Sequence, residues 1–324
     1  MRSRDEMLEL LLSHRGTYLS GEEAAERLHI SRNAVWKAIE KLRSEGYEIE
    51  AAPRRGYRLA EHNDILSPGE LLRDIGLPFT ADRIHVFDQV ESTNRTAKEL
   101  AIGGAPHGTV VMADRQSRGN GRHERTFFSP EGGIYLSIIL RGDQIAYQSS
   151  SMITISAAAF AAEAIEEICG KSPGIKWIND LFLDGKKIGG ILTESASGFE
   201  SGELEWVVIG IGINFRTRED SFPEELKNIA GSIYPDGKNA VSRSELAGSI
   251  IRKILTAGSK KREKILDSYR SRLMLRGETV LIQQKGVARK GVIVGVDDEG
   301  RLIVQMENGE TERYSSGEIS TRRI

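Results

Sequence analysis

The sequence predicts a multidomain α+β protein, with an N-terminal winged helix-turn-helix, a central domain of alternating strands and helices, and a small C-terminal β-barrel. Helical segments and a short hairpin fill residues 1–60, and short alternating strands with Gly, Asp and Asn turns follow from residue 276. A chain of 324 residues is long enough for two or three domains with buried cores. The predicted domains are therefore 1–62, 65–272 and 276–324.

Composition narrows the class of protein. Lys and Arg number 45 against 47 Asp and Glu, so any binding of nucleic acid has to come from a local basic patch. The single Cys169 excludes an internal disulfide and a multi-cysteine zinc site, which fits a reducing, cytoplasmic setting. Cys169 ends an Ala-rich helical segment and is expected in the core. The six histidines show no metal-ligand spacing, and no protein-held metal site is predicted.

Neither the N-terminal stretch nor the most apolar run of the chain has the pattern of a signal peptide or of a membrane-spanning helix. The N-terminal stretch MRSRDEMLELLL is charged within its first six residues and has no small-residue cleavage site after it, which predicts a helix rather than a signal peptide. The most apolar run, MITISAAAFAAEAI, is too short and too rich in alanine to span a bilayer. We expect a soluble protein that does not act on a membrane.

Capping signals and apolar spacing define the helices of the N-terminal domain. Ser20 followed by Glu23 predicts a capping box at the start of one helix. Ser31 is expected to cap a second helix, which ends at Gly46. Within this second helix, the apolar residues at i, i+4 and i+7 should face the core: Val35, Ile39 and Leu42. Two short strands around a Pro-Arg-Arg-Gly tip complete the winged helix-turn-helix.

This domain is predicted to bind DNA. Such motifs place the N-terminal residues of the second helix in the major groove, where Arg and Asn can pair with guanine and adenine edges. Residues 31–58 contain seven basic and four acidic residues. This local excess of positive charge lies on the second helix and the hairpin, where the motif would contact DNA. The candidate DNA-binding residues are Ser31, Arg32, Asn33, Lys37, Arg54 and Arg55. The alternative is a winged helix that makes only protein contacts with solvated charges, and DNA binding is favoured over it.

The usual signatures of nucleotide and hydrolase sites are missing from the central domain. No GxxxxGK[ST] occurs, no GxSxG occurs, and Gly119-x-Gly121-x-x-Glu124 departs from the dinucleotide fingerprint at its last position. The central domain does carry a loop, residues 113–130, in which four arginines surround two glycines. Because glycine lets backbone N–H groups approach a ligand and guanidinium groups pair with oxygens, this loop predicts a phosphate site.

Further polar groups suit a ligand site. Ser92-Thr93-Asn94 and Gln116 offer hydroxyls and amides to a neutral polar ligand. Asp184-Gly185 predicts a two-residue hairpin turn, after which Lys186 and Lys187 point to opposite faces of a strand, so that one of them can enter a site. Asn179-Asp180 could meet a metal ion or an amine. Taken singly, such a lysine is usually solvated and such a loop is often only flexible; their combination favours a site.

Five motifs in a fixed order carry a specific resemblance. The chain contains STN, Q-x-x-G-x-G-R followed by FFSP, KWIND, KKIGGIL and GIGIN. In this combination it resembles the biotin–protein ligases, and with the winged helix in front it resembles their bifunctional form, which also represses the biotin operon. The resemblance covers essentially the whole chain. It implies a central mixed-sheet, class II synthetase-like ligase domain and an SH3-like C-terminal barrel.

The resemblance also implies a two-step reaction that uses ATP and Mg²⁺. The biotin carboxylate would attack ATP to give biotinyl-5′-AMP, and a lysine of a biotin carboxyl carrier protein would then accept the biotinyl group. Because the first step brings two anions together, cationic groups fixed where charge develops should lower its barrier. The same resemblance implies a biotin-responsive repressor of biotin synthesis and uptake genes, which binds operator DNA as a ligand-promoted homodimer.

The resemblance implies a role for the residues of each motif. The biotin ring would contact Ser92, Thr93, Asn94 and Gln116. The loop that closes over biotin and the adenylate phosphate would comprise Gly119, Asn120, Gly121 and Arg122. The biotin carboxylate and the α-phosphate would contact Lys187 and the neighbouring Gly189. Asn179 and Asp180 would contact Mg²⁺ or the incoming lysine. The nucleotide would lie near Asn214. The residues implied to be catalytic are Arg122, Lys187 and Asp180.

Two positions depart from the family pattern. The loop usually reads Gly-Arg-Gly-Arg, and here Asn120 replaces the first arginine, with Arg118 as the residue that could compensate; Phe127 stands where a tryptophan is usual. Asn120 leaves open a ligand-sensing repressor with weak or absent ligase turnover. A third alternative is ligation of a related acyl group such as lipoate, which the STN and Gln116 pattern and the winged helix disfavour.

Overall fold

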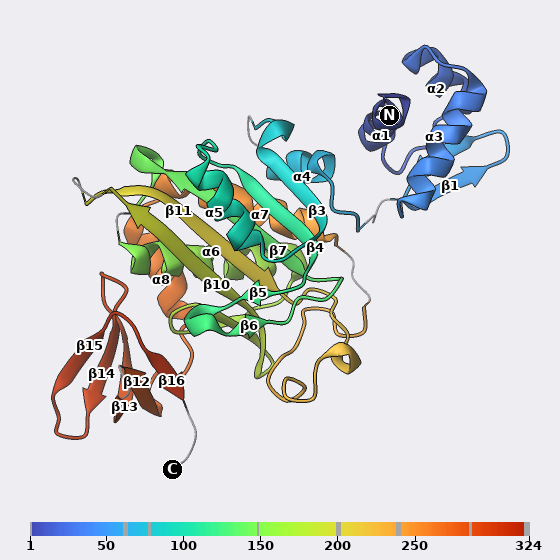
Figure 1. The fold of residues 1–324 in the computed structure, drawn as a ribbon. Coiled ribbons are helices and arrows are strands. Elements are labelled where there is room, and N and C mark those ends of the chain that lie inside the picture. Colours follow the sequence, from blue (N-terminus) through green and yellow to red (C-terminus); the bar gives the residue numbers. More distant parts are fainter. Residues whose placement is uncertain are drawn as a thin grey trace.

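The computed structural model describes residues 2–60, 64–76, 79–147, 149–198, 202–237, 241–284 and 287–320. Within these ranges the chain forms an N-terminal helical domain, a central domain built on a large sheet, and a C-terminal antiparallel β domain (Figure 1). The multidomain α+β class is therefore confirmed. Residues 61–63, which hold one predicted domain boundary and part of the linker, lie outside the described residues, as do residues 321–324, where the predicted barrel ends.

The N-terminal domain has the winged helix-turn-helix order. Its elements are α1 (Arg2–Ser13), α2 (Gly21–Leu28), α3 (Arg32–Ser44), β1 (Ile49–Ala52) and β2 (Gly56–Leu59), and the two strands form an antiparallel hairpin. The Ser20 side chain accepts a hydrogen bond from Glu23 N, and the Ser31 side chain accepts one from Ala34 N, so both caps are confirmed. The Glu23 carboxylate pairs with Arg27 at 2.7 Å rather than with Ser20 N, so the reciprocal half of the predicted capping box is not formed. The predicted core residues of α3 are buried: Val35, Ile39 and Leu42.

A seven-stranded mixed sheet forms the centre of the molecule. The strand order is β3-β4-β7-β11-β10-β9-β8, in which only the β3–β4 pair is parallel. The strands span Ile84–Val90 (β3), Val110–Gln116 (β4), Ile134–Arg141 (β7), Gly174–Lys176 (β8), Asp180–Leu183 (β9), Lys186–Ser197 (β10) and Leu204–Ile213 (β11). Asp184 and Gly185 both have positive φ, 50° and 78°, which confirms the predicted hairpin turn.

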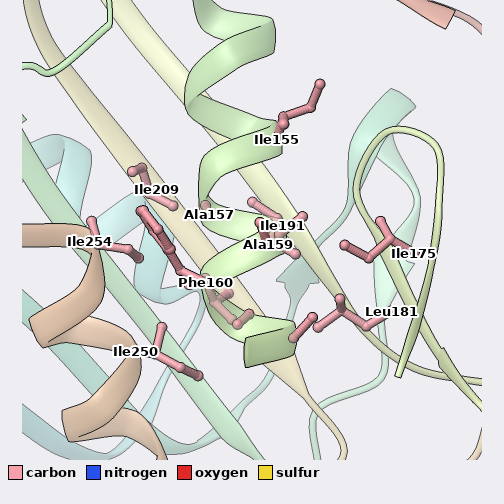
Figure 2. Close-up of a cluster of buried hydrophobic side chains, with 14 of the residues drawn as sticks. Ile155, Ala157, Ala159, Phe160, Ile175, Leu181, Ile191, Ile209, Ile250 and Ile254 are labelled. Carbon is pink, nitrogen blue, oxygen red and sulfur yellow. The ribbon is translucent and has the colours of Figure 1, made fainter. Parts of the chain in front are cut away.

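Helices cover both faces of this sheet. On one face lies α5 (Thr93–Ile102), packed through a small cluster of Ala97, Ala101, Val111, Ile139 and Val208. The main core lies on the other face, where Figure 2 shows Phe160 of α6 among Ile209, Ile250 and Ile254. The helices of that side are α4 (Pro68–Ile75), α6 (Ser150–Cys169), α7 (Arg243–Leu255) and α8 (Arg262–Ser271). Short 3₁₀ turns occupy Ala81–Arg83, Arg122–Glu124, Gly142–Gln144, Glu219–Ser221 and Ala257–Ser259.

The long helix α6 has the buried, alanine-rich character that its sequence predicts. Its alanines are buried because small side chains let a helix approach the sheet closely, and Cys169 is its last, half-buried residue. Burial raises the pKa of the Cys169 thiol to about 11. In the described residues, no helix, α6 included, has both the length and the apolar character needed to cross a membrane.

The C-terminal domain is a five-stranded antiparallel sheet that shares the central core. Its strands are β12 (Thr279–Gln284), β13 (Val287–Val296), β14 (Leu302–Met306), β15 (Thr311–Tyr314) and β16 (Glu318–Ser320), in the order β15-β14-β13-β12-β16. The first four match the predicted strands. The Trp177 indole N–H donates to Gly300 O at 3.1 Å, and a Cβ at Gly300 would lie 2.5 Å from Cδ1 of Ile155. This domain is therefore packed directly on the central one.

A buried charge cluster ties the segment after the N-terminal domain to the central domain. Arg243, 4% exposed, donates to both the carboxylate and the carbonyl of Asp64, and it also pairs with Asp114. Arg216 lies 2.9 Å from the same Asp64 carboxylate. On the other side, Ile65 packs against the N-terminal core. Residues 64–65 therefore contact both domains.

A second ion pair joins the two domains directly. Arg15, in the loop after α1, lies 2.8 Å from the carboxylate of Glu70, a fully buried residue of α4. Arg73 lies 3.0 Å from the same carboxylate. Burial raises the pKa of the Glu70 carboxyl, against the opposite effect of the two arginines. A buried carboxylate with an arginine from each domain favours one arrangement of the domains.

We predict that Arg243→Met lowers the free energy of unfolding by about 3 kcal/mol, because the buried Asp64 carboxylate loses its main partner. Chemical denaturation of the full chain measures this. The matched control is Arg218→Met, since Arg218 pairs with Asp220 on the surface with side chains 71% and 67% exposed. That control should cost less than about 1 kcal/mol. Equal losses in the two variants would contradict the role given to the buried cluster.

Candidate functional site

A cavity of about 300 Å³ opens between the glycine-rich loop and the central sheet. Most of the residues implied by the motifs line it, although they come from segments far apart in the chain: Ser92, Thr93, Asn94, Gln116, Asn120, Gly121, Arg122, Asn179, Asp180 and Lys187. Gly119, Gly189 and Asn214 are not among the lining residues, although Gly119 packs against Gln116 and Gly189 against Gly212, which do line the cavity. The structure therefore gathers the separate sequence motifs into one site.

Buried hydrogen bonds fix the polar end of the cavity. The N–H and the hydroxyl of Thr93 donate to Gln116 Oε1 at 2.8 and 3.2 Å, and Gln116 Nε2 donates to Ser129 Oγ at 2.9 Å. Ser137 Oγ lies 2.6 Å from Asn94 Oδ1 and 2.9 Å from Thr93 Oγ1. Because these groups satisfy one another away from water, each side chain is held in a single orientation.

The network continues outward from Asn94. Its Nδ2 donates to Glu194 Oε2 at 2.9 Å, and Lys98 pairs with the same carboxylate at 2.8 Å. Ser137, Glu194 and Lys98 were not predicted from the sequence. For Ser137 a signal existed, because a small polar residue within the apolar strand IYLSIIL needs a buried partner. No comparable signal marks Glu194 or Lys98, since charged residues near strand and helix ends are usually solvated.

Two glycines of β11 explain the motif GIGIN. Gly210 and Gly212 occupy alternate positions and so face the same side of the sheet. A Cβ at Gly210 would lie 2.6 Å from Cγ of Asn94, and one at Gly212 would lie 2.8 Å from the Phe127 ring. The strand therefore lacks side chains where Asn94 and Phe127 need space. Gly189 plays a different part, since a Cβ there would lie 2.6 Å from Gly212 O and push β10 away from β11.

The glycine-rich loop has its own small hairpin. Strand β5 (Gly119–Asn120) pairs with β6 (Thr126–Phe127), and Gly121 N donates to Arg125 O at 2.7 Å. His123 has φ 54° and lines the cavity, a residue that the sequence did not single out. Arg122 Nη1 donates to Asn179 Oδ1 at 3.2 Å, so the guanidinium reaches from the loop to the end of the KWIND segment.

A cationic and an anionic side chain that line the cavity form an ion pair. Lys187 Nζ lies 2.6 Å from Asp180 Oδ1, and the two side chains are 32% and 27% exposed. Lys186 points away and pairs with Glu219 at 2.7 Å, which confirms that the two lysines face opposite ways. A solvent-accessible ion pair of this kind is weakly held, so an anionic ligand can replace its carboxylate.

Asn214 is 4% exposed and does not line the cavity. Its Nδ2 donates to Gly231 O at 2.9 Å, while its Oδ1 is buried and has no hydrogen-bond partner within the described part of the chain. Such an atom is expensive to leave unpaired, so a donor or a cation is expected to reach it. Among the described residues, no cluster of three His, Cys, Asp or Glu could hold a metal ion by itself.

A larger cavity of about 840 Å³ adjoins the first across the same loop. Residues 120–123 line both, and Arg118 lines only the larger one. Arg118 thus lies on the outer side of the loop, while Asn120 touches both cavities. Gly317 and Ile319 of the C-terminal domain line the smaller cavity, so that domain contributes to the site wall.

The predicted DNA-binding residues lie on one exposed helix face and on the hairpin tip. Arg32 and Asn33 are exposed in the first turn of α3, where Arg32 lies 3.5 Å from the exposed Glu22. The Ser31 oxygen is used as the helix cap. At the hairpin tip Arg54 has φ 63°, and the Arg55 guanidinium stacks 4.1 Å from the centre of the Tyr18 ring. Lys37 follows on α3 and is exposed.

Three family models match the chain in the order of its domains. Residues 86–214 match the biotin/lipoate A/B protein ligase family. Residues 4–58 match an HTH domain, and residues 277–322 match the biotin protein ligase C terminal domain.

Individual proteins are similar over most of the chain. The bifunctional ligase/repressor BirA of Bacillus spizizenii is 36% identical over 326 residues, which cover 98% of this chain and 98% of that protein. BirA of Escherichia coli is 29% identical, with 95% and 94% covered. The structure of a biotin protein ligase from Aquifex aeolicus in complex with biotin and ATP has a TM-score of 0.62 and 29% identity, and covers 74% of this chain and 99% of that one.

We predict that Gly210→Ala lowers the free energy of unfolding by about 2 kcal/mol, because the added methyl group overlaps Asn94 and breaks its buried network. Equilibrium denaturation measures the change. Gly258→Ala is the control, since no atom lies within 4 Å of a Cβ there and its effect should stay near zero. Adding Asn94→Ala to Gly210→Ala should restore part of the loss. Strictly additive losses would show that the two residues do not meet.

Proposed function

The chain belongs to the biotin/lipoate A/B protein ligase family, and from this premise we propose that it is an ATP-dependent biotin–protein ligase that also acts as a biotin-responsive transcriptional repressor. One observation carries the ligase assignment: a single cavity is lined both by neutral polar side chains held in a hydrogen-bond network and by the cations Lys187 and Arg122. A ligand with a neutral polar ring and an acidic tail matches both sets of groups. The helix-turn-helix domain in front of this site supports the repressor.

Ser92, Thr93, Asn94 and Gln116 would bind the urea ring of biotin. The urea group has two N–H donors and one carbonyl acceptor. In a buried site, binding is favourable only if each of these polar atoms finds a hydrogen-bond partner. Amide and hydroxyl groups, held by Ser137 and Glu194, offer both donors and acceptors. Gly210 and Gly212 leave room for the ring, and the half-buried Phe127 closes the apolar side.

Arg122 and Lys187 would support the first reaction step. An oxygen of the biotin carboxylate forms a bond to the α-phosphorus of ATP, and the bond from that phosphorus to the bridging oxygen breaks as pyrophosphate leaves. Negative charge accumulates on the phosphate oxygens during this exchange, so fixed cations stabilise the transition state more than the ground state. Lys187 would exchange its Asp180 partner for the ligand's oxygens, and Gly121 would let the loop backbone approach them.

The nucleotide phosphates would bring Mg²⁺ into the site. Mg²⁺ usually binds through one or two protein oxygens together with substrate phosphates, and it neutralises charge on the leaving pyrophosphate. The residues present fit this arrangement, because Asp180 lines the cavity and offers a carboxylate. Asn179 would stay as the hydrogen-bond partner of Arg122 and orient the guanidinium.

The second step would transfer the biotinyl group to a lysine of a biotin carboxyl carrier protein. The lysine nitrogen forms a bond to the acyl carbon, the bond from that carbon to the phosphate oxygen breaks, and AMP leaves. Once pyrophosphate has left with its Mg²⁺ and Lys187 has turned to the phosphate, the Asp180 carboxylate would orient the incoming ammonium group and accept its proton. Asn120, Gly121, Arg122 and His123 border both cavities, so the acceptor could approach through the larger one.

Repression would follow from thermodynamic linkage between adenylate binding in the cavity and DNA binding by the N-terminal domain. If the adenylate binds the dimer better than the monomer, it promotes a homodimer, and a two-fold dimer can span two operator half-sites. Ser31, Arg32, Asn33, Lys37, Arg54 and Arg55 would contact that DNA. Consumption of ATP and of a carrier protein, together with the lone Cys169, supports a cytoplasmic location.

We predict that the purified chain, mixed with biotin, ATP and Mg²⁺ but no acceptor, retains about one biotinyl-5′-AMP per chain and releases equimolar pyrophosphate. Mass spectrometry and a pyrophosphate assay measure this. Arg122→Ala should lower the rate of adenylate formation roughly a hundredfold, because a cation that acts in the transition state is lost.

The control for this assay is Lys186→Ala, since Lys186 faces away from the cavity, and its rate should stay near that of the parent. Biotin binding without adenylate formation would instead favour a ligand-sensing repressor, and an Asn120→Arg variant that gained adenylate formation would trace the defect to the loop.

We also predict that deletion of residues 1–60 abolishes DNA binding and leaves biotinylation of a carrier domain detectable, since the cavity lies in the central and C-terminal domains. Gel shift and streptavidin blotting measure the two activities. Deletion also removes Arg15 from the buried Glu70, so the full-length double variant Arg32→Ala with Lys37→Ala serves as control. It should lose DNA binding with ligation unchanged. Loss of ligation in both would show that the two activities are not separable.

A further inference from the structure

Trp36 is exposed on the helix that is predicted to enter DNA. Its side chain is 51% exposed, whereas Trp177 is 4% exposed. Among the exposed large apolar side chains of the described residues, Trp36 is the one that belongs to the N-terminal domain. The domain core therefore does not account for this residue, and a large aromatic ring left in water suggests a contact outside the domain.

The position of Trp36 on α3 gives the direction of that contact. The opposite face of the helix is buried through Val35, Ala38, Ile39 and Leu42. Trp36 follows Arg32 by four residues and Asn33 by three, so the three side chains are neighbours on one exposed side of the helix. Glu40 continues this side one turn further on.

The junction with the central domain uses other residues. Arg15 binds Glu70 across the domain boundary, and Ile65 packs on the N-terminal core. Trp36 is not part of either contact and remains half exposed with the domains in place. The exposed basic residues Arg32 and Lys37 lie on the same helix as Trp36, and their charge is complementary to a nucleic acid.

We propose that Trp36 is a specificity-determining residue of the DNA interface, whose indole ring packs against the C5-methyl group of a thymine in the operator's major groove. This inference rests on the proposed repressor function. Arg32 and Asn33 can pair with guanine and adenine, but the thymine methyl is apolar and is read only by an apolar surface. Trp36 supplies that surface one turn from the two hydrogen-bonding residues.

The contact differs from the phosphate contacts in a measurable way. A phosphate contact lowers affinity for every sequence when it is lost, whereas a methyl contact lowers affinity only for DNA that carries the methyl group. Replacing one thymine by deoxyuridine removes this group and keeps the base pairing. The variant and the modified base can therefore be combined in a double-mutant cycle.

The experiment uses the full chain with biotin, ATP and Mg²⁺ present. The probe is the duplex that the parent protein selects from a randomised library, and affinities are measured by fluorescence anisotropy. Trp36→Ala should bind this duplex roughly tenfold more weakly. Deoxyuridine at one thymine position should weaken the parent by a similar factor and leave Trp36→Ala unaffected. Trp36→Phe, which keeps an apolar ring, should keep the thymine dependence.

Controls separate the possible failures. Lys37→Ala should weaken binding to the thymine and deoxyuridine duplexes equally, and thermal unfolding of each variant checks that it is folded. Equal weakening of Trp36→Ala on both duplexes would assign the indole to the sugar–phosphate backbone, and unchanged affinity would make it a solvated surface residue; either result overturns the inference. If the parent selects no duplex, operator binding itself is wrong and the inference falls with it.

Discussion

The close packing of Asn94 against Gly210 is the contact on which the ligand site depends. Asn94 stands at the start of α5, and its amide occupies the space that any side chain on β11 at this point would fill. Ser137, from the neighbouring strand β7, then meets Asn94 Oδ1 from beneath. One missing side chain therefore lets an amide reach the centre of a sheet, where Glu194 of β10 completes its hydrogen bonds. The polar end of the cavity is rigid because the side chains of Thr93, Asn94 and Gln116 are hydrogen-bonded to other groups.

The charged groups that line the cavity are held less firmly. Lys187 and Asp180 form an accessible ion pair, and Arg122 donates a hydrogen bond to Asn179. These contacts are weak enough to be exchanged for ligand oxygens, yet they keep the cations close to their working positions. A neutral ring would therefore bind to polar groups that are already fixed in position. An anionic group would bind to Lys187 and Arg122, which can exchange their present partners for ligand oxygens. This division suits a reaction in which the ring stays fixed while the charged groups are transformed.

The ligand site and the N-terminal domain are joined by short stretches of structure. Arg243 binds Asp64 of the linker and Asp114, which precedes Gln116 of the site by two residues on β4. Arg216, which also binds Asp64, follows Asn214 by two residues. The linker is therefore held by the same segments that form the cavity. A shift of either segment on ligand binding would act on the linker directly, which gives the proposed regulation a physical connection.

By itself, the sequence determined the domain order, the helix caps and core faces of the winged helix, the hairpin turn at Asp184-Gly185, and the motifs that line the cavity. These depend on local rules: capping, periodicity, and residues required by a ligand rather than by the fold. Only the tertiary structure decided that Ser137 and Glu194 hold Asn94, and that Gly189 packs strands while Gly190 faces the cavity. Those roles arise because β7, β11 and β10 are neighbours in the sheet, and strand order is set by hydrogen bonds between segments far apart in the chain, which no local pattern contains.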